Sequence, residues 1–129
     1  MASNFHKVAE FHRAFDQPAP AEHQSNVIKQ DPKLCSFRIS LIEEEFNELK
    51  QAIKTDNFAE VRDALADILY VVYGTAVAFG IDADKDFEIV HASNMSKLCD
   101  NEEDAKATVE WYQSKIAEGT CPYNDPVYT

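Results

Sequence analysis

Residues 41–53 read LIEEEFNELKQAI and belong to a segment whose apolar side chains recur every three or four positions. Across residues 32–54 these positions are Ile39, Ile42, Phe46, Leu49 and Ile53. This period is typical of an α-helix that packs one face on another helix, and Pro32 suits its first turn. We therefore predict a helix over residues 32–54.

A second long helix is predicted to follow directly. Asn57 and Glu60 form a capping box at its start, and Gly80 can end it near residue 79. From Ile68 onward the segment is apolar on every side, as in a helix at the centre of a bundle. Shorter helices are predicted over residues 4–15, 82–98 and 102–118, with a proline-containing loop after the first of them.

Size and composition indicate one all-α domain. The chain has 129 residues with only 3 glycines and 5 prolines, so we predict a single domain over residues 1–129. Its expected architecture is a bundle of four to five helices. The apolar stripe of residues 32–54 is compatible with completion of the bundle by a second copy of the chain.

Charge, cysteine content and hydropathy disfavour several classes of partner. A net charge of −11 disfavours nucleic acid, whose phosphates need clustered Lys and Arg. The 3 cysteines form no metal-binding or disulfide pattern, which favours a reduced, cytoplasmic protein. The longest apolar run, residues 68–81, is shorter than the roughly 20 residues that span a bilayer, so no membrane segment is expected.

Acidic residues fall within the apolar face of the helix over residues 32–54. Turning 100° per residue places Glu45 inside the apolar arc, Glu48 at its edge and Glu44 beside it. A lone buried carboxylate is costly, so the side chain of Glu45 needs a partner. Three interpretations are open: a solvated acidic face, an ion pair with Arg38 upstream, or a metal site.

The following helix carries a second acidic stripe, made of Glu60, Asp63 and Asp67. Two helices that aim carboxylates at a shared core repel each other unless cations are present. Ligation by oxygen alone suits Mg²⁺, and Mn²⁺ could substitute for it. The sequence therefore predicts a Mg²⁺ site held by carboxylates.

The run HASNMSK, residues 91–97, is the third candidate element. His91 and Asn94 share the apolar face of their predicted helix, with Lys97 at its margin, and together they could bind phosphate oxygens. A satisfied core histidine is the alternative for His91. A di-iron bundle would need two ExxH motifs, and this chain offers one, Glu88 with His91.

These motifs resemble the all-α nucleotide pyrophosphohydrolases, the superfamily of MazG-type proteins, dimeric dUTPases and phosphoribosyl-ATP pyrophosphatase. Glu44, Glu45 and Glu48 match the EExxE element of that superfamily. Asp67 matches the aspartate of its ExxD element, but Ala64 stands where a glutamate is usual. Asp63 or Glu60 could supply the missing carboxylate, and we favour Asp63, one turn before Asp67.

The segments FHRAF (residues 11–15) and VHASNMSK (residues 90–97) resemble the phage and bacterial MazG-like branch with a phosphoribosyl-ATP-pyrophosphatase-like domain. Relatives of that branch often continue further, so a C-terminally shortened chain is an open alternative. The resemblance also implies a homodimer or a dimer of dimers.

The activity implied by the resemblance is Mg²⁺-dependent hydrolysis of a nucleoside triphosphate, with a deoxynucleotide expected, to the monophosphate and pyrophosphate. Water would attack the α-phosphorus. The implied metal ligands are Glu45, Glu48, Asp63 and Asp67. Two alternatives are a phosphoribosyl-ATP pyrophosphatase and a non-catalytic helical interaction module.

The resemblance also assigns roles around the metal. Glu44 would orient or deprotonate the water. The expected substrate-binding residues are His91, Asn94, Lys97 and Tyr70. An aromatic pocket for the base could come from Phe11, His12 and Phe15, or from Tyr70 and Tyr73.

Overall fold

The computed structural model describes residues 2–98, 110 and 111, and every regular element in this part of the chain is a helix. The helices are α1 (Asn4–Ala14), α2 (Val27–Gln30), α3 (Pro32–Lys54), α4 (Phe58–Ala78) and α5 (Ala83–Ser96). The all-α prediction is confirmed, and the predicted ends of four helices agree closely with those observed. The helix predicted over residues 102–118 lies outside the described residues, apart from Glu110 and Trp111, which are helical.

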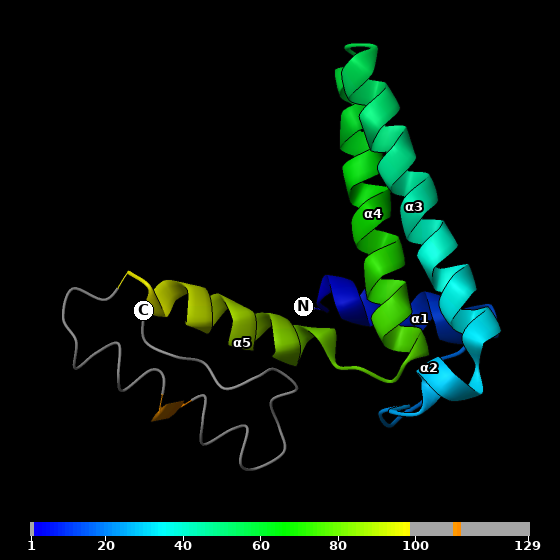
Figure 1. Cartoon of the computed structure of the whole chain (residues 1–129), viewed down its shortest axis with the longest axis vertical. Helices are drawn as coiled ribbons and strands as arrows, with labels where there is room; N and C mark the ends of the chain where they lie inside the picture. The colour runs from blue at the N-terminus through cyan, green and yellow to red at the C-terminus, as the bar shows by residue number, and fades with distance from the viewer. Residues whose placement is uncertain (1, 99–109, 112–129) are drawn as a thin grey trace. The chain divides into compact units, whose positions relative to one another are not determined.

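The longest feature is an antiparallel hairpin made by α3 and α4 (Figure 1). Its turn is a Schellman motif, in which the Asn57 N–H donates to the Ala52 carbonyl at 2.9 Å and the Asp56 N–H donates to the Ile53 carbonyl at 3.2 Å. Asp56 has a φ of 54°, a left-handed conformation that aspartate tolerates better than most residues. Asn57 then caps α4, because its side chain accepts the Glu60 N–H at 3.1 Å. This short turn brings α3 and α4 side by side along their length.

α1 packs on α4 at the end of the hairpin away from this turn (Figure 1). Ser3 caps α1, with its hydroxyl accepting the His6 N–H at 3.1 Å. Val8 and Ala9 of α1 form a buried cluster with Val77 of α4. The contact fixes the position of α1 on the same hairpin that carries the acidic stripes.

The loop between α1 and α3 contains α2, a four-residue helix that the sequence pattern did not predict. A helix this short has no apolar period to detect. After α2, Asp31 caps α3 through its side chain, which accepts the Leu34 N–H at 3.1 Å. α2 thus leads directly into the start of α3.

Gly80 ends α4 as predicted. It has a φ of 71°, its N–H donates to the Val77 carbonyl at 3.1 Å, and the Ile81 N–H donates to the Ala76 carbonyl at 2.9 Å. A Cβ atom at Gly80 would also collide with the backbone of Glu22. Glycine is therefore required both by the helix end and by the loop that passes against it.

α4 is not enclosed on every side within this unit. Leu65, Leu69 and Val72 remain about half exposed, although α3 and α1 cover other faces of the helix. In the described part of residues 1–83, α4 is therefore not the fully buried central helix that the sequence predicts. α4 therefore keeps an exposed apolar face among the described residues.

The structure divides into two compact units, residues 1–83 and residues 84–129, so α5 lies almost entirely in the second unit. Within the part of the chain that the structure describes, no single helix has both the length and the apolar character to cross a membrane, and only α4 and α5 taken as a broken pair pass on length and composition.

Candidate active site

Three carboxylates meet between the two helices of the hairpin. Glu45 and Glu48 come from α3 and Asp67 comes from α4, and each offers an oxygen within 4.8 Å of the others. Oxygen ligands around one Mg²⁺ ion lie up to about 4.2 Å apart, so these carboxylates are close to the spacing that such an ion requires. We refer to Glu45, Glu48 and Asp67 as the acidic cluster.

Glu45 is the most constrained member of the acidic cluster. Its Oε2 atom is buried, and it has no hydrogen-bond partner among the described residues. Burial raises the pKa of Glu45 to about 7, and a hydrogen bond with Glu48 together with the charges of Glu48, Asp67 and Glu44 raises it further. A buried oxygen without a donor and a carboxylate surrounded by like charges both call for a cation.

Asp67 shows the same effect from the other helix. Burial raises its pKa, and the negative charges of Asp63 and Glu48 add to the shift. Asp63 is exposed and lies outside the acidic cluster, but it is near enough for its charge to act on Asp67. Glu44 is likewise exposed and acts on Glu45 through its charge. Asp63 and Glu44 therefore flank the acidic cluster.

Ala64 occupies the position at which a further carboxylate was expected from the resemblance. It is 2% exposed, in the interface between α3 and α4. A small side chain there permits close packing of the two helices. Any carboxylate that replaces the missing one must therefore approach from the flank of the hairpin, where Asp63 and Glu60 are exposed.

The ion pair between Arg38 and Glu45, an alternative to a metal site, does not form. Arg38 is buried, its Nε donates to the Thr75 hydroxyl at 3.2 Å, and its Nη2 donates to the Val71 carbonyl at 3.0 Å. Within residues 2–98, 110 and 111, no carboxylate pairs with its guanidinium. Among the described residues, no cation forms an ion pair with the acidic cluster.

A cavity of about 340 Å³ lies beside the acidic cluster on the same two helices. Leu41 lies one turn before Glu45 on α3, and Val71 lies one turn after Asp67 on α4; both line the cavity. Its aromatic walls are Phe11, Phe15, Phe37 and Tyr70, and its polar residues are His12, Gln17 and Arg38. We refer to this space as the aromatic cavity.

The aromatic cavity is lined by residues from both of the predicted alternatives for a base pocket. Phe11 and Phe15 stack with ring centroids 4.6 Å apart, and Tyr70 meets the ring of Phe11 edge-on at 5.7 Å. Tyr73 instead packs against the buried cluster of α1 and α4. The structure thus brings the α1 aromatics and Tyr70 to one place and gives Tyr73 a role in the core.

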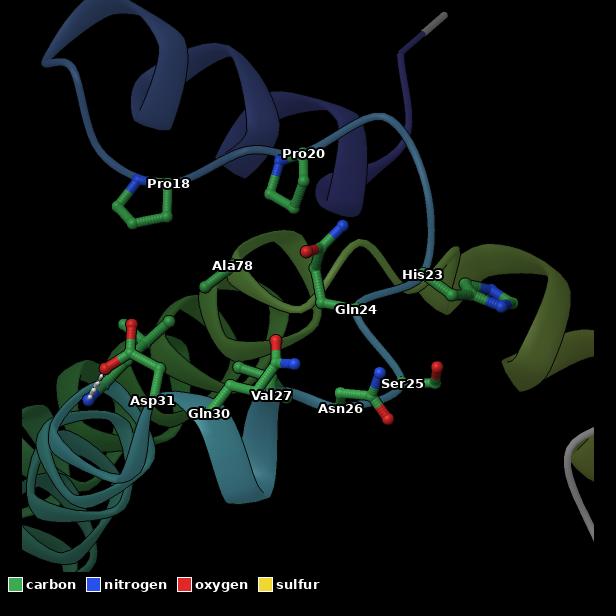
Figure 2. Close-up of a pocket in the computed structure, with 11 residues that line it drawn as sticks. Pro18, Pro20, His23, Gln24, Ser25, Asn26, Val27, Gln30, Asp31 and Ala78 are labelled. Carbon is green, nitrogen blue, oxygen red and sulfur yellow. Dashed lines mark hydrogen bonds between the residues drawn. The ribbon is translucent and has the colours of Figure 1, made fainter.

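A larger cavity, of about 550 Å³, lies between the loop after α1 and the start of α3 (Figure 2). Its polar lining is mostly neutral and includes Gln24, Ser25 and Asn26, and the carboxylate of Asp31 is engaged in capping α3. Among the described residues no lysine or arginine lines it, and His23 is its basic side chain. A site without a cluster of cations or carboxylates does not suit a polyphosphate, so size alone does not make it the active site.

Two substrate-binding candidates on α5 and one directly after it belong to the second unit. His91, Asn94 and Lys97 are exposed, and the Lys97 ammonium donates to the Asn94 side-chain oxygen at 3.2 Å. His91 is therefore not a buried core histidine. The roles of these three residues toward the acidic cluster stay predictions.

Comparison with known proteins agrees with the geometry of the acidic cluster. The phosphoribosyl-ATP pyrophosphohydrolase family matches residues 8–94, which contain the acidic cluster and the aromatic cavity. An uncharacterized protein, L479, of Acanthamoeba polyphaga mimivirus is 42% identical over 83 residues, or 64% of this chain. The chain spans about a third of the length of that relative (33%). Because the family match covers well over half of the sequence, the chain belongs to the phosphoribosyl-ATP pyrophosphohydrolase family, in the all-α, MazG-like nucleoside triphosphate pyrophosphohydrolase superfamily.

Proposed function

We propose that the chain hydrolyses a nucleoside triphosphate between its α and β phosphates, in the presence of a divalent cation, and releases the monophosphate and pyrophosphate. The observation that carries the proposal is the buried, unpartnered Oε2 of Glu45 facing the carboxylates of Glu48 and Asp67. Without a cation this arrangement is repulsive, and a triphosphate supplies further oxygens to share one. Mg²⁺ is the expected ion, and Mn²⁺ could replace it.

In this proposal some residues bind the cation and another accepts a proton from water. Glu45, Glu48 and Asp67 would hold the cation, which when bound neutralises charge on the phosphates and on the pyrophosphate leaving group. Glu44 is exposed beside the acidic cluster, so its carboxylate can accept a proton from the water that attacks the α-phosphorus. Asp63 would complete the ligand set beside Asp67. Asn94 and His91 of α5, with Lys97 just after it, would bind phosphate or sugar.

A deoxynucleoside triphosphate is our expected substrate, and phosphoribosyl-ATP is the second candidate because the matching family carries that name. Both substrates present a phosphate chain to the metal, so the acidic cluster suits either. The two substrates differ at the base, which carries an additional phosphoribosyl group in phosphoribosyl-ATP. The choice between them therefore rests with the residues that surround the base.

We also propose that the chain works as a homodimer, or as a dimer of dimers. Ile39, Phe46 and Ile53 of α3 repeat every seven residues, and each is half exposed or more. Phe58, Leu65 and Val72 of α4 repeat with the same spacing and are also exposed. Such seams on two antiparallel helices are half of a four-helix bundle, which a second copy of the same hairpin completes. Charged substitution of Phe46 should lower the oligomeric state measured by sedimentation.

Metal and substrate tests separate this function from a non-catalytic helical module. Titration of Mg²⁺ by calorimetry should show binding that Glu48→Gln removes without loss of helical circular dichroism. A screen of ribo- and deoxyribonucleoside triphosphates and phosphoribosyl-ATP, with products resolved by chromatography, should yield a monophosphate and pyrophosphate. Absence of both Mg²⁺ binding and hydrolysis would leave the interaction module as the function.

A further inference from the structure

Arg38 lines the aromatic cavity and has a donor that no described residue uses. The guanidinium is held at two of its nitrogens, Nε and Nη2, by Thr75 and Val71. Among the described residues its third nitrogen, Nη1, has no hydrogen-bond partner, and it is not sealed from solvent. Since Arg38 is only 6% exposed and lines the aromatic cavity, the two N–H groups of Nη1 are available to a ligand there.

His12 presents an acceptor to the same space. Its Nδ1 lies 2.8 Å from the Pro18 carbonyl, which can only accept a hydrogen bond, so Nδ1 carries the proton. In the neutral ring Nε2 is then an acceptor. Nε2 has no partner within the described part of the chain, although His12 is 4% exposed. An acceptor that no described residue uses, on a side chain that lines a cavity, can accept a hydrogen bond from a ligand there.

Gly74 leaves room for both side chains. A Cβ atom at this buried position of α4 would lie 3.0 Å from His12 Nε2 and would collide with Nη2 of the Arg38 guanidinium. The missing side chain therefore lets the guanidinium from α3 and the imidazole from α1 pack against the same backbone position. α4 gives up helix propensity for this, because glycine costs about 1 kcal/mol relative to alanine within a helix.

The surroundings of this pair fit a planar heterocycle. Phe11, Phe15 and Tyr70 offer ring faces and edges, and the guanidinium carbon of Arg38 lies 5.9 Å from the centroid of the Phe37 ring. A base in the aromatic cavity would lie one helical turn from Glu45 and Asp67, next to the phosphates of the same nucleotide. The donor and acceptor would then meet the edge of the base.

We propose that Arg38 and His12 read the edge of the base and select bases with a carbonyl next to a ring N–H, namely guanine, hypoxanthine, uracil and thymine, over adenine and cytosine. Arg38 donates to the carbonyl oxygen and His12 accepts from the ring N–H. This inference rests on the proposed function, because it takes the nucleotide phosphates to lie at the acidic cluster.

The preference follows from the two N–H groups of Arg38 Nη1. A carbonyl oxygen has two lone pairs and accepts both, whereas the ring nitrogen beside the amino group of adenine or cytosine has one lone pair. The guanidinium is also charged and buried without a carboxylate, so it favours the acceptor with more negative charge. Arginine donating to guanine O6 is the common form of this pairing at base edges. Adenine-based substrates, phosphoribosyl-ATP included, would therefore be poor ones.

The test compares substrates that differ only at this edge. With wild-type protein and Mg²⁺, inosine triphosphate should exceed adenosine triphosphate in kcat/KM, and uridine triphosphate should exceed cytidine triphosphate, each by about tenfold. The N1-methylinosine analogue keeps the carbonyl but lacks the N–H, so it should lose this advantage. Equal or reversed preference in both pairs would overturn the inference.

A variant tests whether His12 sets the preference. His12→Asn keeps an N–H that can donate to the Pro18 carbonyl but removes the acceptor at Nε2, so kcat/KM for inosine triphosphate should fall to that for adenosine triphosphate. His6→Asn makes the same change at an exposed histidine of α1 and should retain the preference. An unchanged preference in folded His12→Asn would contradict the role of His12, and wild-type data with the methylated analogue decide the matter if that variant does not fold.

The outcomes separate this inference from the proposed function. Hydrolysis of all triphosphates at equal rates would overturn the base preference and leave the pyrophosphohydrolase intact. Absence of hydrolysis, with calorimetry still showing tighter binding of inosine than of adenosine triphosphate in Mg²⁺, would overturn the proposed activity and support the aromatic cavity as a base site.

Discussion

Replacing Glu45 with glutamine should stabilise the protein in the absence of divalent cations. The pKa of Glu45 rises from an ordinary value of 4.5 to about 7 in the folded chain. Between these two values the folded state keeps a proton that the unfolded chain has lost, so stability falls as pH rises through this interval. Above pH 7 the carboxylate is ionised in both states, and the folded chain carries the full cost of its burial.

The magnitude follows from the shift. Each pKa unit corresponds to about 1.4 kcal/mol, so the full rise from 4.5 to about 7 would correspond to about 3.5 kcal/mol. Because the Glu45 side chain is partly exposed, solvent screens some of the repulsion, and we expect the Glu45→Gln variant to gain about 1 to 3 kcal/mol in free energy of unfolding at pH 8. At pH 4 the gain should be close to zero, because wild-type Glu45 is then largely protonated in both states.

Urea unfolding followed by circular dichroism, in EDTA from pH 4 to pH 8 and at one protein concentration, measures this difference. Glu43→Gln is the matched control, since it removes the same charge from an exposed position on α3. Addition of Mg²⁺ should stabilise wild type and leave Glu45→Gln unchanged. A variant that is no more stable than wild type at pH 8, or a gain that does not vary with pH, would refute the account of Glu45.

Four other substitutions test the roles of individual residues. If Asp63 is the fourth carboxylate ligand, then Asp63→Asn should lower Mg²⁺ affinity and turnover sharply, while Glu60→Gln should have a mild effect. The opposite ranking in calorimetry would assign the ligand role to Glu60. Gly74→Ala should destabilise the fold by about 1 to 2 kcal/mol in urea unfolding, because losing a charged hydrogen bond of Arg38 outweighs the gain in helix propensity; a stabilised variant would mean that the guanidinium is free to move. Lys97→Ala should raise KM more than it changes stability, and wild-type kinetics would make Lys97 a surface residue.

Local signals in the sequence were enough for the helices. The capping residues Asn57 and Gly80 act through hydrogen bonds to their own neighbours, so their pattern marks the ends of α4 without knowledge of the rest of the fold. The 100° turn per residue also placed Glu45 on the inner side of α3. The buried Oε2 of Glu45 is what that position predicted.

Contacts between distant segments could not be predicted in this way. Arg38 bonds to Val71 and Thr75, more than thirty residues further along the chain, and nothing in the pattern of α3 favours these partners over Glu45. Which acids of a stripe meet also depends on how α3 and α4 cross, so the sequence could not show that Asp67 joins the acidic cluster while Asp63 flanks it. The signal for the aromatic cavity was present in Phe11, His12 and Phe15, but Arg38 and Gly74 become informative only once α1, α3 and α4 are packed.

The position of bond cleavage tests the central claim most directly. A nucleoside triphosphate is hydrolysed with Mg²⁺ in water enriched in ¹⁸O, and the products are resolved and read by mass spectrometry. Attack of water on the α-phosphorus predicts a monophosphate that carries the ¹⁸O label and a pyrophosphate that does not. Label in the pyrophosphate, or release of orthophosphate with a nucleoside diphosphate, would contradict the account.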